Sequence, residues 1–249
     1  MAGHSQFKNI MHRKGAQDKK RAKIFTKILR EIHVAVKANG PDPTSNPKLR
    51  VALLNARESN MPKDNVERAI AKASGEDAGS DYIETRYEGY GPGGVAVIVE
   101  CLTDNRNRTA PEVRHIFSKG GGNMGETGSV AFMFDRLGYL RYSLDKLTAD
   151  EMFEAALEAG AENVETTDEG HEIYCSVEDF ATVRDSLTAK YEDPESGKLI
   201  WKPQNPHSIS DLETAQKFIK FIDAMEDNDD VQNIWHNADI PDVIAEKLG

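Results

Sequence analysis

Cysteine and long apolar runs are both scarce in this chain of 249 residues. Only Cys101 and Cys175 are present, which excludes a disulfide scaffold and fits a reducing compartment. No run of about 18 apolar residues occurs, so no transmembrane helix is expected. The first residues lack the apolar stretch of a secretory signal. We therefore expect a cytoplasmic protein that contacts no membrane.

Patterns of metal ligands and catalytic nucleophiles are missing as well. The seven histidines show no H-x-x-x-H companion, and neither C-x-x-C nor G-x-S-x-G occurs. Both cysteines lie in apolar strand patterns, which are typical of inert core residues. Carboxylates make only a weak case for acid/base chemistry, because surface charge is their default role. Those considered are Glu84, Glu88, Glu100 and Asp104. We expect no metal, no cofactor and no enzymatic activity.

Two glycine-rich stretches imitate nucleotide-binding motifs without the context those motifs need. Residues 89–94 match G-x-G-x-x-G, but the pattern that follows predicts a strand and not the helix that receives a pyrophosphate. We interpret them as a turn between strands. Residues 120–127 resemble a P-loop in which Glu126 stands where the motif has Lys. Because this reverses the charge required at the phosphates, no nucleotide site is predicted there.

Positive and negative charge are divided unequally along the chain. Residues 1–72 contain 16 Lys and Arg against 6 Asp and Glu, a net charge of +10. Residues 73–249 contain 15 against 36, a net charge of −21. The overall charge of −11 therefore conceals a basic module attached to an acidic body. Such a module is typical of polyanion binding, and the acidic body restricts where RNA or DNA can lie.

Helical periodicity predicts three helices before residue 75. Residues 18–36 carry an apolar stripe at i, i+3, i+4 and i+7 spacing, with a row of cations on the opposite side. Asn46 and Pro47 predict the cap and the first residue of a second helix. A third helix is expected over residues 62–73. Together the three favour a small bundle.

The periodicity changes after a predicted linker at residues 75–80. Strands are expected at residues 82–87, 95–103 and 129–135, with a helix at 111–119. Residues 139–202 then follow the order βαββαβ of a ferredoxin-like unit. A last helix and a strand at 231–235 cannot form a core alone, so they are expected to return to the earlier sheet. The predicted class is α+β with an N-terminal three-helix bundle (1–75), a discontinuous α/β domain (81–136 plus 205–249) and an inserted ferredoxin-like domain (137–204).

The N-terminal basic segment is the strongest candidate for a binding site. Lysines and arginines neutralise phosphates and release counterions, which gives affinity independent of sequence. The alternative is a solvated helix face, but residues 1–30 carry a single acid, Asp18. The predicted nucleic-acid-binding residues are His4, Lys8, His12, Arg13, Lys14, Lys19, Lys20, Arg21, Lys23, Lys27, Arg30, Lys63 and Arg68.

A second contact is predicted around a basic turn and the glycine-rich stretch that follows it. Amides at a helix start attract anions, and guanidinium groups add bidentate phosphate contacts. The alternatives are that Arg106 and Arg108 pair with acids of the body, that Thr109 is only a helix cap, and that the glycines form a mobile loop after a helix. The predicted residues are Arg106, Arg108, Arg114, Lys119, Gly121, Gly122, Asn123, Met124 and Gly125, with Met124 expected to be flexible and exposed.

Long motifs through most of the chain resemble the YebC-type family. They are Gly3-His4-Ser5, Asn9-Ile10, His12-Arg13-Lys14, Asp18, Lys20-Arg21 and residues 60–70, 87–94, 103–109 and 121–134. One departure is Phe7, where we expect Trp more often. The family includes a mitochondrial translational activator of cytochrome c oxidase. The resemblance implies three domains, the middle one split.

The resemblance also implies two competing functions. Some members are described as DNA-binding transcriptional regulators, and others as ribosome-associated translation factors that relieve stalling, notably at consecutive prolines. Our leading hypothesis is a non-enzymatic translation factor that binds ribosomal RNA. The alternative is a DNA-binding regulator, although the exposed cations are mainly lysines, which suit phosphates better than base edges. Nothing in the sequence indicates a dimer, so a monomer is expected.

Overall fold

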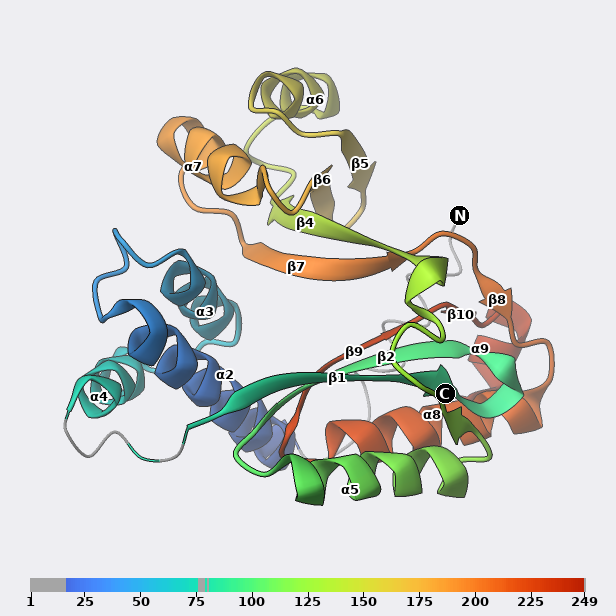
Figure 1. Cartoon of the computed structure of the whole chain (residues 1–249). Coiled ribbons are helices and arrows are strands. Elements are labelled where there is room, and N and C mark those ends of the chain that lie inside the picture. Colours follow the sequence, from blue (N-terminus) through green and yellow to red (C-terminus); the bar gives the residue numbers. More distant parts are fainter. Residues whose placement is uncertain (1–16, 76–78, 80, 249) are drawn as a thin grey trace. The chain divides into compact units, whose positions relative to one another are not determined.

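The described residues of the computed structural model form two compact units (Figure 1). The structure describes residues 17–75, 79 and 81–248, with the backbone alone for residues 17–20. The first unit comprises residues 17–27, 81–135 and 203–248. The second unit comprises residues 28–75, 79 and 136–202. None of the helices in these ranges is both long and apolar enough to cross a membrane.

The three predicted N-terminal helices are present as α2 (Gln17–Asn39), α3 (Pro47–Glu58) and α4 (Lys63–Ser74). The side chain of Asn46 accepts a hydrogen bond from the Leu49 amide, so the predicted cap is confirmed. Its side-chain amide also donates to the carbonyl of Ala35, which ties α3 to α2. These bonds satisfy a buried polar side chain that would otherwise destabilise the bundle.

A four-stranded antiparallel sheet in the order β3-β1-β2-β9 forms the centre of the first unit. Its strands are β1 (Ile83–Tyr90), β2 (Ala96–Thr103), β3 (Asn123–Met124) and β9 (Val231–His236). Helices α5 (Arg106–Lys119) and α8 (Leu212–Glu226) cover one face, as Figure 1 shows. The turn η1 (Pro92–Gly94) joins β1 to β2, which confirms the interpretation of residues 89–94. Strand β9 pairs with β2, so the last part of the chain does return to this sheet.

Four predicted details of the first unit are wrong or incomplete. No strand covers residues 129–133, where a turn leads into the short helix η2 (Ala131–Met133). Helix α5 begins before Pro111, because the side chain of Asn105 accepts from the Arg108 amide and caps it there. Thr109 therefore lies inside the helix and is not its cap. Four short strands and helices were not predicted: β3, β8 (His207–Ser208), β10 (Ala238–Asp239) and α9 (Asp242–Leu248).

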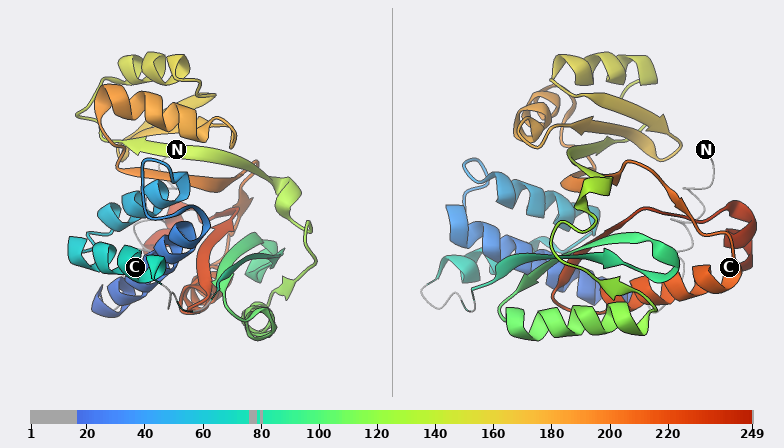
Figure 2. Two further views of the ribbon diagram at one scale, coloured as in Figure 1. Left: turned by 60° about the vertical axis from the view of Figure 1, so that its left-hand side comes forward. Right: turned by 45° about the vertical axis from the view of Figure 1, so that its right-hand side comes forward.

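The second unit contains the ferredoxin-like fold that the order of elements predicted. Its elements are β4 (Phe134–Tyr142), α6 (Ala149–Glu158), β5 (Asn163–Thr167), β6 (Gly170–Cys175), α7 (Phe180–Tyr191) and β7 (Ser196–Pro203). The sheet order is β5-β6-β4-β7, and α6 and α7 pack on one of its faces (Figure 2). Thr148 and Glu151 form the predicted capping box at the start of α6.

Helix α3 also contacts the ferredoxin-like part of the second unit. Arg57 pairs with Asp193 at 2.7 Å, and Val51 packs against the apolar core beneath α6 and α7. The sequence pattern did not foresee this contact, because it links residues more than a hundred positions apart. The division into three domains with the boundaries given above stays a prediction.

Candidate nucleic-acid interface

The most basic part of the predicted interface lies largely outside the described residues. His4, Lys8, His12, Arg13 and Lys14 fall in residues 1–16, and the side chains of Lys19 and Lys20 also lie outside the description. Their role therefore rests on the charge of the sequence. The backbone of α2 does show that Lys19 and Lys20 belong to its first turn.

Within α2, the predicted row of cations divides into two groups. Arg21 is exposed, and its guanidinium lies 5.4 Å from the centre of the Phe25 ring. Lys23 instead donates to the Asp227 carboxylate at 2.6 Å and to the Asp227 carbonyl at 2.9 Å. Lys27 donates to the carbonyl of Glu226 at 3.3 Å. Two of the predicted phosphate ligands thus contact the end of α8.

The end of α8 attracts these lysines for a simple electrostatic reason. The last carbonyls of a helix lack partners within it and carry partial negative charge. Burial lowers the pKa of Lys27, partly offset by the negative charge of Glu226. The predicted assignment of Lys23 and Lys27 to an open cationic row is therefore corrected, since both contribute to the packing of α2 on α8.

Replacing Lys23 and Lys27 together by glutamine is expected to leave nucleic-acid affinity within about threefold of wild type. The free energy of unfolding should fall by less than about 1 kcal/mol, because the Lys23 pair is half-exposed and solvent screens it. The matched comparison is Lys8 and Lys14 replaced by glutamine, which removes the same charge from the N-terminal segment. Equal losses of affinity in the two double variants would contradict this division of the lysines.

The two cations predicted on α4 interact with their own helix. Lys63 lies 3.5 Å from Glu67 one turn later. The guanidinium of Arg68 donates to the Asp64 carbonyl at 3.0 Å and to the Asn65 side chain at 2.6 Å. Both side chains are exposed, so each remains accessible to a phosphate in addition to these partners.

The basic turn before α5 is part of the helix itself. Arg106 and Arg108 lie in its first turn, and Arg114 and Lys119 are exposed further along it. Arg108 donates to the buried carboxylate of Asp230 at 2.7 Å and to Asp104 at 3.0 Å. Pairing with acids of the body, the alternative considered above, is therefore confirmed for Arg108. Arg106 is exposed in this turn, so it remains the predicted anion contact here.

Asp230 holds the start of α5 in place, and the sequence pattern did not single it out. The hydroxyl of buried Thr109 donates to the same carboxylate oxygen as Arg108, at 2.7 Å. Thr103, at the end of β2, lies 3.3 Å from that oxygen. This network joins β2, the start of α5 and the loop before β9.

Part of the glycine-rich stretch after α5 forms the short strand β3 of the sheet. Asn123 and Met124 pair with Tyr90 and Gly89 of β1. Met124 is half-buried and packs against the core, so the prediction of a flexible, exposed Met124 is wrong. A Cβ on Gly122 would collide with the backbone of Tyr90. Gly122 is therefore explained by a close approach within the chain itself, whereas Gly121 is exposed at a positive φ of 85°.

Comparisons with known proteins identify the family on both sides of the predicted linker. The family model described as "TACO1/YebC protein N-terminal domain" matches residues 5–76. The family model described as "TACO1/YebC second and third domain" matches residues 82–238.

The chain belongs to the TACO1/YebC family.

A solved structure agrees with this assignment. The TACO1/YebC chain resembles a conserved hypothetical protein from Aquifex aeolicus with a TM-score of 0.78 and 46% sequence identity. The match covers 90% of this chain and 92% of that one. The family consists in general of nucleic-acid-binding proteins of the transcription-regulator type. The resemblance drawn from the sequence motifs is therefore confirmed, and so is the mixed helix and sheet fold.

Among the four carboxylates considered for acid/base chemistry in this TACO1/YebC chain, Glu88 is the one that is buried, not on the surface. Its carboxylate accepts hydrogen bonds from the amides of Val130 and Ala131 at 3.1 and 2.9 Å and pairs with Arg86 at 3.0 Å. Burial alone raises the pKa of Glu88, but these amides, the Gly128 amide and Arg86 together hold it below its usual value. Glu88 is an ionised structural anchor.

The two cysteines fit the predicted role of core residues. Both are buried and free. Burial raises the pKa of the Cys101 thiol to about 12 and that of Cys175 to about 11. Such thiols stay protonated and unreactive near neutral pH. In the part of the chain that the structure describes, no cluster of three or more His, Cys, Asp or Glu side chains could hold a metal ion.

Proposed function

We propose that this chain is a non-enzymatic translation factor that binds the ribosome through ribosomal RNA. The observation that carries the proposal is the concentration of positive charge in residues 1–30, which contain nine lysines and arginines but only one acidic residue. An RNA backbone offers closely spaced phosphates to such a segment, and binding releases their counterions. The family assignment supports nucleic acid as the class of partner.

In this proposal the N-terminal segment is the anchor and α5 the second contact. Lys8, Arg13, Lys14, Lys19 and Lys20 neutralise phosphates, and Lys23 and Lys27 hold α2 against α8 at the end of the anchor. The Asp230 network keeps α5 rigid, so that Arg106, Arg114 and Lys119 meet a second stretch of RNA.

The factor acts by position and not by acid/base chemistry. Relief of stalling at consecutive prolines requires the two reacting groups on the ribosome to be brought into alignment, and alignment alone can lower a barrier substantially. Buried carboxylates and both thiols are engaged in the fold: Glu88 binds backbone amides, Asp230 binds Arg108, and the cysteines have raised pKa values. We propose that the chain works as a monomer in the cytoplasm.

The second candidate is a DNA-binding regulator of transcription, which the transcription-regulator character of the family favours. Specific DNA readout uses side chains that make bidentate contacts with base edges, commonly Arg, Asn or Gln. Six of the nine cations in residues 1–30 are lysines, which favour phosphates over base edges.

Sedimentation with purified ribosomes, compared with footprinting on genomic promoter fragments, separates the two functions. The translation factor is expected to sediment with ribosomes in the presence of excess duplex DNA and to protect no particular promoter sequence. The proposal would be overturned if the protein did not sediment with ribosomes and protected one promoter sequence even in excess competitor DNA.

A further inference from the structure

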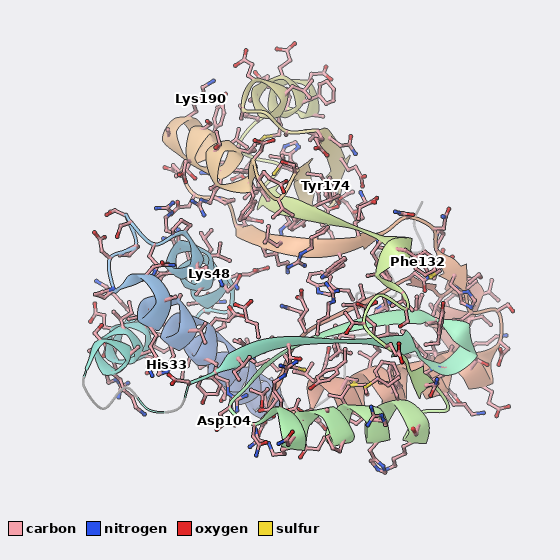
Figure 3. All side chains as sticks on the ribbon, viewed as in Figure 1. His33, Lys48, Asp104, Phe132, Tyr174 and Lys190 are labelled. Carbon is pink, nitrogen blue, oxygen red and sulfur yellow. The ribbon has the colours of Figure 1, made fainter. Side chains whose placement is uncertain are left out.

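Phe132 is the most exposed of the large apolar side chains in the described residues. It lies on η2, between β3 and β4, and 70% of it is accessible to solvent (Figure 3). Its neighbours along the chain, Val130 and Phe134, are buried. The ring is therefore exposed within a segment whose flanking residues are fixed in the interior.

The backbone that carries Phe132 is held by several hydrogen bonds. The buried carboxylate of Glu88 accepts from the amides of Val130 and Ala131, immediately before Phe132. The Met133 amide donates to the Val130 carbonyl at 2.9 Å, and the Met133 carbonyl accepts from the Gln204 amide at 3.0 Å. Because the segment is already ordered, a partner that binds the ring pays little conformational entropy.

The sequence neighbours of Phe132 add no further large apolar side chain to the surface, which favours a single flat partner over a protein surface. The other exposed residues between 120 and 135 are Gly121, Asn123, Glu126, Thr127, Gly128 and Asp135. None of these is a large apolar residue, whereas the core of a protein interface needs a contiguous apolar patch. The ring itself is open to solvent, so a planar group can lie against it.

We infer that Phe132 is a stacking platform for an unpaired nucleobase of the bound RNA. The inference rests on the proposed function and adds a contact of a different physical kind. Stacking on an aromatic ring accepts every base, because each has a π-face. It involves no counterion release, so its contribution to affinity does not depend on salt in the way that phosphate contacts do.

A second exposed aromatic side chain, on β1, points to the side of the sheet that meets the segment carrying Phe132. Tyr90 is 40% exposed and follows Glu88 by two positions on β1. Residues two apart on a strand point to the same side, and Glu88 points toward the segment that carries Phe132. Tyr90 is therefore placed to contact a neighbouring nucleotide.

The test measures ribosome affinity of the full-length Phe132→Leu variant over a range of salt concentrations. We expect about tenfold weaker binding at every salt concentration, with an unchanged slope of log K against log salt. Phe132→Trp keeps a ring and should bind as well as wild type. The matched control is Phe153→Leu, which alters another exposed phenylalanine on α6 and should have no effect.

Three results would overturn the inference. They are an unchanged affinity in Phe132→Leu, an equal loss in Phe153→Leu, and a loss in Phe132→Trp as large as that in Phe132→Leu. The last would indicate a shaped protein pocket. None of them affects the proposed function, which is judged by whether the wild-type chain prefers ribosomes to duplex DNA.

Ultraviolet cross-linking of the ribosome complex gives a direct check of the inference. A nucleotide adduct is expected on the peptide that contains Phe132, and an adduct confined to other peptides contradicts the inference.

Discussion

Replacing Lys8, Arg13, Lys14, Lys19 and Lys20 together by glutamine is expected to weaken ribosome binding by at least about 100-fold near 0.1 M salt. Each cation that neutralises a phosphate contributes to the release of counterions, so the loss of several contacts multiplies. The slope of log K against log salt should become clearly flatter in this variant. Affinity measured at several salt concentrations tests both expectations at once.

The control for this variant removes the same charge from the acidic body. Lys146, Lys190, Lys217, Lys220 and Lys247 are exposed lysines outside the predicted interface. Replacing these five by glutamine is expected to change ribosome affinity by less than about threefold, because none is placed against a phosphate in this account. If both variants lost affinity to the same degree, net charge and not a defined anchor would explain the binding.

The Glu88→Gln variant is expected to lower the free energy of unfolding by about 2 kcal/mol at neutral pH. The substitution removes a charge that binds the amides of Val130 and Ala131 and the guanidinium of Arg86. A glutamine amide group retains only one acceptor oxygen for these donors. Urea denaturation of both proteins measures the difference, and exposed Glu126→Gln is the matched control.

The pH dependence of this effect has a defined sign. Because the pKa of Glu88 is lower in the folded state, its ionised form stabilises the fold above the ordinary carboxylate value of 4.5. That contribution disappears as the pH falls through the lowered folded-state pKa. The stability gap between wild type and Glu88→Gln should therefore be full at neutral pH and shrink under acid conditions below about pH 4.5. A gap that stays constant with pH would show that the charge of Glu88 is not the source of the stability.

Features specified by nearby residues were the ones that could be predicted. Asn46 caps α3 through a residue three positions away, and Thr148 and Glu151 form their capping box within one turn. The order of the ferredoxin-like elements follows from the alternation of strand and helix periodicity. Each of these signals lies within a short window of sequence, where steric and hydrogen-bonding preferences act directly.

The parts of the candidate site that sequence reasoning missed depend on distant residues. Lys23 meets Asp227, and Arg108 meets Asp230, more than a hundred positions away in each case. The row of cations on α2 predicts a cationic face of the helix. It does not show whether that face meets solvent or the end of another helix. Glu88 resembles any polar residue on a half-exposed strand, because the segment that covers it comes forty positions later. The exposure of Phe132 could not be predicted either, because Phe132 lies among the apolar residues 130–134, whose sequence does not indicate which of them meets solvent.

A salt titration tests the central claim most directly. It measures, side by side, the binding of the wild-type protein to purified ribosomes and to random duplex DNA. The account predicts a ribosome complex that persists at salt concentrations where DNA binding has vanished, because the shape of the RNA and stacked bases add affinity that salt does not remove. Equal affinities with parallel salt slopes would show only general polyanion binding and would contradict the assignment to the ribosome.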